Sequence, residues 1–213
     1  MLAHTETHTH EEVLSIYHKL TRYSNYLIYV TIVVFILGML TYGQPFSFKE
    51  HAISHFGRIR TQDGSPNTLS LFIYGIGMIM SSLICFRLSN LSEDNTSHNL
   101  FRLAAIGYIL LIVPCDILHK IHSIGGALVI GSLWLLTVIL LHDLFRYSNR
   151  VRIYLFHLIL QGTVLPYAFL YAFGSPLCPL VQKFAVAGLI ISLRLVIGEH
   201  EKNADYADVL INK

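Results

Sequence analysis

Six polar side chains that can bind a metal ion or move a proton lie in two short stretches of an otherwise apolar chain. They are His51, Ser54, His55, Asp116, His119 and His122. His51 and His55 stand four residues apart, so they share one face if residues 48–56 are helical. Asp116, His119 and His122 follow at steps of three, which also keeps successive members near one helix face. These types and spacings are typical of a site for metal or proton chemistry.

A carboxylate and several imidazoles can supply the ligands of a catalytic zinc ion. Such a site has three protein ligands and one position open to water. We predict as ligands His55, Asp116, His119 and His122, and we expect Ser54 to hydrogen-bond a developing oxyanion. The alternative is a closed network of hydrogen bonds among these groups, which would hold two loops rigidly together.

The composition excludes an ordinary soluble domain. The chain has 213 residues, of which 54% are hydrophobic and only 13% are charged, and its mean hydropathy is +0.56. A net charge of +2 with no basic stripe argues against a nucleic-acid partner. The three cysteines have no metal-ligand spacing.

The order of apolar segments predicts an all-α, polytopic membrane protein with six transmembrane helices in one bundle. A span needs about 20 apolar residues, and the absence of alternation favours helices over barrel strands. The expected spans are residues 26–42, 69–88, 101–115, 121–141, 151–173 and 180–197. The third is short and reaches the usual length only if it continues toward His119.

The chain divides into an N-terminal segment 1–25, a transmembrane domain 26–198 and a C-terminal tail 199–213. In the first segment, residues 9–12 (THEE) have the form of a capping box. Apolar residues then recur at helical spacing, as at Val13, Ile16 and Leu20. This pattern predicts an amphipathic helix on the membrane surface.

The distribution of lysine and arginine predicts the orientation. Ten lysine and arginine residues are expected on the membrane side that carries the two tails, and five on the other side. Cytoplasmic loops carry the excess of positive charge. Both termini are therefore expected in the cytoplasm, and both polar stretches at the outer face.

Two segments carry a resemblance to a known family. They are residues 53–57 (ISHFG) followed by 65–67 (SPN) and Phe72, and residues 113–116 (VPCD) followed by His119, His122 and 125–127 (GGA). This pattern resembles six-helix membrane proteins of the FRAG/DRAM/Sfk group and a related uncharacterised prokaryotic family. The resemblance implies a six-helix bundle and, from the eukaryotic members, a role in lipid-anchor remodelling and membrane lipid biology.

A more distant similarity links Ser54, Asp116, His119 and His122 to the Ser, Asp and His residues of seven-helix zinc hydrolases of the ceramidase and progestin-receptor type. The chain has no counterpart of the histidine pair on their final helix. This similarity implies hydrolysis of a lipid at a zinc ion.

Two functions from different classes fit these features. The first is a metal-dependent lipid hydrolase or acyl-transfer enzyme that uses zinc at the outer leaflet. The second is a non-catalytic membrane protein that binds lipid or a protein partner, either another membrane protein or a second copy of the chain. A small transporter fits less well, because the spans contain few polar groups and no inverted repeat or broken helix is evident.

Overall fold

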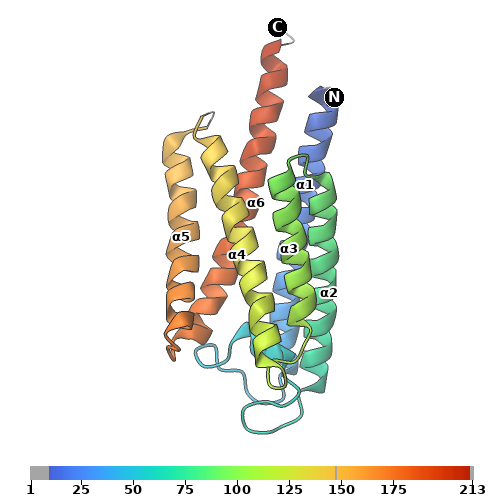
Figure 1. Cartoon of the computed structure of the whole chain (residues 1–213), viewed down its shortest axis with the longest axis vertical. Helices are drawn as coiled ribbons and strands as arrows, with labels where there is room; N and C mark the ends of the chain where they lie inside the picture. Colours follow the sequence, from blue (N-terminus) through green and yellow to red (C-terminus); the bar gives the residue numbers. More distant parts are fainter. Residues whose placement is uncertain (1–9, 147, 212–213) are drawn as a thin grey trace, which may run out of the picture.

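A computed structural model describes residues 10–146 and 148–211, and these form an all-helical bundle (Figure 1). The six α-helices are α1 (His10–Thr41), α2 (Thr68–Leu91), α3 (Asn95–Leu111), α4 (His119–Leu144), α5 (Arg150–Ala172) and α6 (Cys178–Ile211). One short 3-10 helix, η1 (Ile53–Gly57), lies in the long loop between α1 and α2. The prediction of an all-α fold is confirmed.

The chain runs up and down, so its connections fall at the two ends of the bundle. Both described ends of the chain lie at one end, with the short α2–α3 and α4–α5 connections (Figure 1). The other end, called the loop end here, carries residues 42–67, 112–118 and 173–177. Both polar stretches from the sequence therefore lie at the same end.

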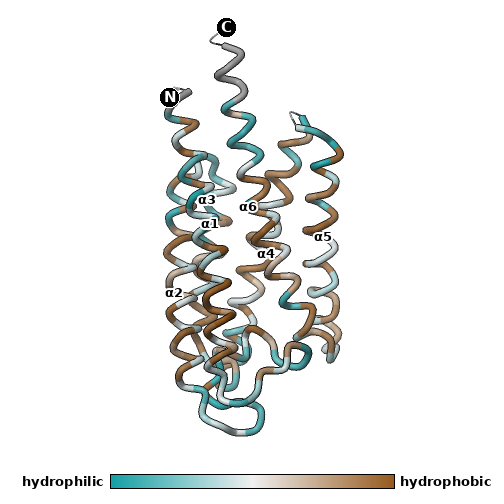
Figure 2. Tube along the Cα trace, turned by 180° about the vertical axis from the view of Figure 1, so that it is seen from behind, coloured by the Kyte–Doolittle hydropathy of each residue, from teal (hydrophilic) through white to brown (hydrophobic). Residues whose placement is uncertain are grey.

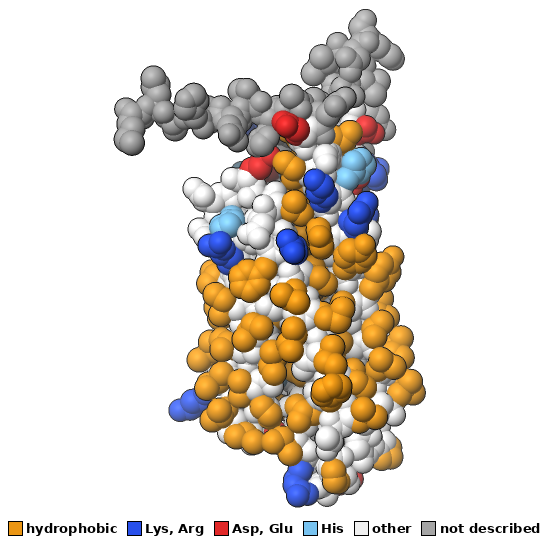
Figure 3. Space-filling model, turned by 90° about the vertical axis from the view of Figure 1, so that its right-hand side faces the viewer, with side chains coloured by type: hydrophobic (Ala, Val, Ile, Leu, Met, Phe, Trp, Pro, Cys, Tyr) orange, Lys and Arg blue, Asp and Glu red, His pale blue; other side chains and the backbone are white. Residues whose placement is uncertain are grey.

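The surface has the composition of a membrane protein. Five helices, α1, α2, α4, α5 and α6, are long and apolar enough to cross a membrane. Hydrophobic residues follow the middle of the helices, and hydrophilic residues gather in the loops and toward the chain ends (Figure 2). On the face shown in Figure 3, hydrophobic side chains form a broad belt with lysine and arginine above and below it.

Helix α3 ends earlier than the sequence suggested. It stops at Leu111 and α4 begins at His119, so the expected continuation of the third span toward His119 is wrong. Pro114 gives the physical reason, because proline lacks the backbone N–H and disfavours helical geometry at the preceding residue. Asp116 consequently lies in a turn and shares no helix face with His119 and His122.

The amphipathic surface helix expected before the first span is not confirmed as a separate element. Helix α1 runs without a break from His10 to Thr41. The predicted capping box begins at Thr9, which lies outside the described residues.

The long loop is held by Asn67 rather than by a helix over residues 48–56. A helix over these residues would have placed His51 and His55 on one face, but only η1 forms there, and His51 precedes it. The buried Asn67 side chain donates from Nδ2 to the carbonyl oxygens of Phe56 at 3.1 Å and Arg58 at 3.0 Å. Its Oδ1 accepts from the backbone N–H of Gly43 at 3.2 Å. One buried amide therefore fixes both arms of the loop.

Helices α3 and α4 approach closely at a pair of glycines. A Cβ atom on Gly107 would lie 2.8 Å from the Gly125 carbonyl oxygen, and a Cβ on Gly125 would lie equally close to the Gly107 carbonyl oxygen. Both positions exclude a side chain, and α3 packs tightly beside α4 as a result.

Candidate functional site

A cavity of about 630 Å³ extends from the loop end into the middle of the bundle. All five predicted catalytic residues line it, although they come from separate segments of the chain: Ser54, His55, Asp116, His119 and His122. Its walls include residues of all six helices, and it reaches as far as Trp134 near the centre of α4. The structure thus brings the predicted residues to one space.

The cavity is polar at the loop end and apolar further inside. Arg58 and Asp116 are the only formally charged side chains among the described residues that line it. Further into the bundle the walls are formed mainly by aliphatic side chains, among them Met78, Leu133 and Leu189. A cavity of this kind matches a ligand with one polar end and one apolar end.

Asp116 joins the two loops. Its Oδ1 and Oδ2 accept from the backbone N–H of Ile59 at 3.2 and 3.0 Å, and Oδ2 also accepts from the N–H of Arg60 at 3.1 Å. Both carboxylate oxygens are therefore engaged by backbone donors. This arrangement supports the networked alternative more directly than it supports a metal ligand.

His122 is the most deeply buried of the five residues, with 5% of its surface exposed. Its Nδ1 lies 2.8 Å from the carbonyl oxygen of Val113. Its Nε2 is buried and has no hydrogen-bond partner. The ring stacks on that of Tyr74, with the centroids 6.3 Å apart and the planes inclined by 23°. One ring nitrogen thus holds the turn, and the other has no partner.

His55 and His51 lie in the loop with their rings 6.1 Å apart. The backbone N–H of Ala52 donates to His55 Nδ1 at 3.2 Å. Burial, followed by the charge of Arg58, lowers the pKa of His55 to about 4. Its ring is therefore neutral at pH 7. His51 is buried against Gln44 and Ser47, and it is not among the residues that line the cavity.

His119 is exposed at the start of α4 and belongs to a chain of hydroxyl groups. Its Nε2 lies 3.4 Å from Ser123 Oγ. That oxygen accepts from the Tyr171 hydroxyl of α5 at 2.8 Å. Ser123 and Tyr171 were not predicted from the sequence, although the spacing of four residues between His119 and Ser123 is a signal that both could share a helix face.

Ser54 takes part in the loop contacts through its backbone. Its carbonyl oxygen accepts a weak hydrogen bond from Cys115 Sγ at 3.5 Å. Burial raises the pKa of Cys115 to about 11, so this thiol keeps its proton at neutral pH.

The four predicted zinc ligands do not converge in the manner of a metal centre. Within residues 10–146 and 148–211, no group of three or more His, Cys, Asp or Glu side chains is placed to hold a metal ion. Asp116 uses both oxygens on backbone donors, as described above. Zinc binding stays a prediction.

No protein-family model, curated protein or solved structure matches this chain. The resemblance to the FRAG/DRAM/Sfk group therefore stays a prediction.

Two residues of α6 that were not predicted from the sequence hold the loop over the cavity. Gln182 Oε1 accepts from the backbone N–H of Ile53 at 2.9 Å, and its Nε2 donates to the Tyr167 hydroxyl at 3.3 Å. The buried Lys183 donates from Nζ to the carbonyl oxygens of His51 at 2.5 Å and Pro179 at 2.8 Å. A polar pair at the start of a span was the only signal in the sequence.

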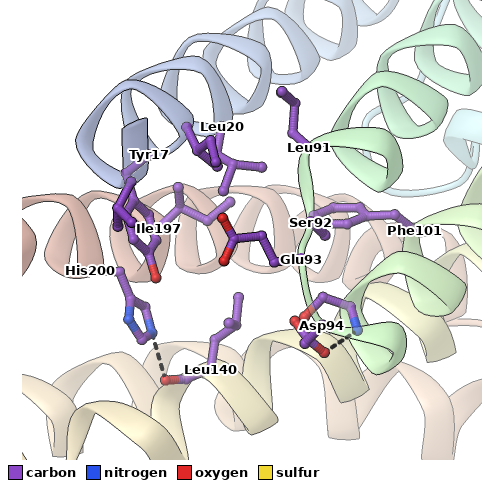
Figure 4. A pocket seen from close by; sticks show the side chains of 13 residues that line it. Tyr17, Leu20, Leu91, Ser92, Glu93, Asp94, Phe101, Leu140, Ile197 and His200 are labelled. Atoms are coloured by element: carbon purple, nitrogen blue, oxygen red, sulfur yellow. Dashed lines mark hydrogen bonds between the residues drawn. The ribbon is translucent and has the colours of Figure 1, made fainter. Parts of the chain in front are cut away.

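A second cavity, of about 230 Å³, lies at the opposite end of the bundle between α1, α3, α4 and α6 (Figure 4). Asp94 accepts from the backbone N–H of Ser97 at 2.7 Å and caps α3. His200 Nε2 lies 3.1 Å from the carbonyl oxygen of Leu140. Because these wall groups serve the helices themselves, the larger cavity is the better candidate for a ligand site.

Proposed function

We propose that this protein binds a single-chain amphiphile inside the membrane, with the chain of the ligand between the helices and its polar head at the loop end. The observation that carries this proposal is the cavity of about 630 Å³, whose charged lining residues lie at one end and whose inner walls are mainly aliphatic. Ligand cavities generally have volumes of about 300–1,000 Å³, mostly apolar walls and a few polar groups.

The proposal includes six membrane crossings with both termini in the cytoplasm. Helix α3 is shorter than the other five helices, but it packs beside both α2 and α4 (Figure 1). The excess of lysine and arginine toward the chain ends supports the cytoplasmic assignment. The polar end of the cavity would then lie near the outer leaflet, from which a lipid can enter sideways.

Binding accounts for the polar residues better than metal-dependent hydrolysis does. Asp116 serves the loop backbone through both of its oxygens, which leaves it poorly placed to activate water. His55 and Arg58 can still offer donors to a polar head, and His122 can offer an acceptor. These donors and this acceptor are suited to binding a polar head group without catalysing a reaction on it.

Acyl transfer is a second candidate function, supported by one contact. Ser123 Oγ lies 3.4 Å from His119 Nε2, so the imidazole can accept the hydroxyl proton while the oxygen attacks an ester carbonyl. The ester C–O bond then breaks, the acyl group stays on Ser123, and the imidazolium returns the proton to the departing alcohol. A fluorophosphonate probe should then label the wild type and should not label Ser123→Ala. Equal labelling of the two proteins would remove this candidate.

Photocrosslinking in lipid nanodiscs tests the proposed binding. The probe is a monoacyl lipid with a diazirine at the end of its chain, and mass spectrometry locates the labelled residues. We expect labels on the cavity walls formed by α4, α5 and α6. Labels spread over the outer surface alone would contradict the proposal.

A matched pair of glycine variants makes this test specific. Gly126 lines the cavity, and a Cβ added there meets its nearest neighbour, Leu111, only at 3.9 Å. Gly75 on α2 has nothing within 4 Å of such a Cβ and does not line the cavity. Gly126→Phe should therefore reduce labelling of the cavity walls several-fold, whereas Gly75→Phe should leave it unchanged.

A further inference from the structure

The unpartnered nitrogen of His122 specifies what the bound head group must offer. The Val113 carbonyl can only accept a hydrogen bond, so His122 Nδ1 carries the proton. In the neutral ring, Nε2 is then an acceptor. This atom is buried without a partner, which costs free energy unless a donor reaches it.

The place of His122 in the cavity wall separates it from the other residues that have a buried polar atom without a partner. Within the described residues these atoms are His122 Nε2, the Tyr42 hydroxyl and Ser192 Oγ. Only His122 lines the large cavity. Its neighbour Tyr74 stacks on the ring face, and a stacking contact does not satisfy an in-plane lone pair.

The charges around the cavity favour an uncharged head. Arg58 and Asp116 are the only formally charged residues among the described lining residues, and their charges are opposite. Asp116 is bound to backbone donors, and Arg58 donates from Nε to the carbonyl oxygen of Arg60 at 3.1 Å. Because these two formal charges sum to zero over the described lining, a charged head gains no net electrostatic attraction from them, whereas moving its charge out of water costs free energy.

We infer that the ligand is a neutral monoacyl lipid with a hydroxylated head, of the monoacylglycerol class, whose O–H donates to His122 Nε2. This inference rests on the proposed function and adds the class of ligand to it. The ester and second hydroxyl oxygens of such a head can accept from Arg58 or from the protonated Nε2 of His55. The acyl chain fills the apolar part of the cavity.

Competition against the photoreactive monoacyl probe in nanodiscs tests this inference. The competitors share one acyl chain: a monoacylglycerol, the propyl ester of the same fatty acid, which has no O–H, and the free fatty acid. We expect the monoacylglycerol to compete about tenfold better than the propyl ester, which is the usual contribution of one buried hydrogen bond. We expect the charged fatty acid to compete less well.

Two variants identify the atom responsible. His122→Phe keeps an aromatic ring beside Tyr74 and removes the acceptor, so it should abolish the preference for monoacylglycerol over propyl ester. Ser192→Ala removes a buried unpartnered hydroxyl outside the cavity and should retain the preference. If His122→Phe does not fold, the ratio measured on the wild type still decides the question.

The outcomes separate the two levels of the proposal. Equal competition by monoacylglycerol and propyl ester, or tighter binding of the fatty acid, overturns the inference and leaves lipid binding standing. If the probe does not label the cavity at all, the proposed function itself fails.

Discussion

Asp116 accepts the backbone N–H of Ile59 through both carboxylate oxygens, at 3.2 and 3.0 Å, across 57 positions of the chain. This contact joins the α3–α4 turn to the long loop between α1 and α2. It sets the shape of the polar end of the cavity, since Arg58 and Asp116 both line it.

Replacement of Asp116 should loosen this connection. Asp116→Ala removes the acceptor of two backbone N–H groups and should lower the free energy of unfolding by about 1–2 kcal/mol. Asp116→Asn keeps one acceptor oxygen, and we expect roughly half that loss. Thermal unfolding in detergent measures the difference. His119→Ala is the control, because His119 is exposed and has one long side-chain contact. Equal stability of Asp116→Ala and wild type would show that the contact contributes nothing.

Acid should destabilise the loop end through His55. Its folded-state pKa of about 4 lies below the ordinary value of 6.5, because the ring is buried and Arg58 is nearby. Between these values the unfolded chain binds a proton that the folded chain does not, so stability is full above about pH 6.5 and falls as the pH approaches 4. The loss is at most about 3 kcal/mol and is reduced by solvent screening at the exposed part of the ring.

Melting temperatures measured from pH 7.5 down to pH 4 check this expectation. His55→Gln should flatten the curve in that range. Some slope should remain, because burial also lowers the pKa of His51. A variant curve that coincides with that of the wild type would rule out His55 as the source.

Gln182 should control the order of η1. Gln182→Leu removes the acceptor of the Ile53 N–H. Hydrogen exchange of residues 53–57 should therefore become faster, by about tenfold for one lost hydrogen bond. Gln161→Leu is the matched control, because Gln161 Oε1 accepts from Trp134 Nε1 at 2.9 Å, between α4 and α5. Unchanged exchange in Gln182→Leu would mean that other contacts hold the segment.

Removal of metal should leave the protein unaltered. Because Asp116 is committed to backbone donors, we expect elemental analysis to find much less than one zinc per chain. Dialysis against a chelator should change neither the melting temperature nor the labelling by the monoacyl probe. One bound zinc per chain, with a loss of stability on chelation and recovery on adding zinc, would favour the hydrolase reading instead.

The sequence was sufficient for the parts of the fold that depend on hydrophobicity and connectivity. Long apolar segments locate the helices, because backbone groups in lipid must be paired within the helix. Counting those segments places residues 51–55 and 116–122 at one end. The structure brings five of the predicted residues to one cavity: Ser54, His55, Asp116, His119 and His122.

Contacts that depend on the path of irregular backbone could not be predicted in this way. The carboxylate of Asp116 meets the N–H groups of Ile59 and Arg60 only because Pro114 ends α3 early and the loop turns beneath it. The roles of Asn67 and Gln182 likewise depend on which backbone groups the loop leaves unpaired. No local spacing in the sequence encodes these partners.

The paired glycines of α3 and α4 have a consequence for evolution. At Gly107 and Gly125 even a methyl group would collide with the opposite backbone, so drift at either position is constrained by the other. Homologous proteins that retain this bundle should keep glycine at both positions even where most other residues differ. A search for distant homologues can begin from these two glycines together with Pro114, which lies between them in the sequence.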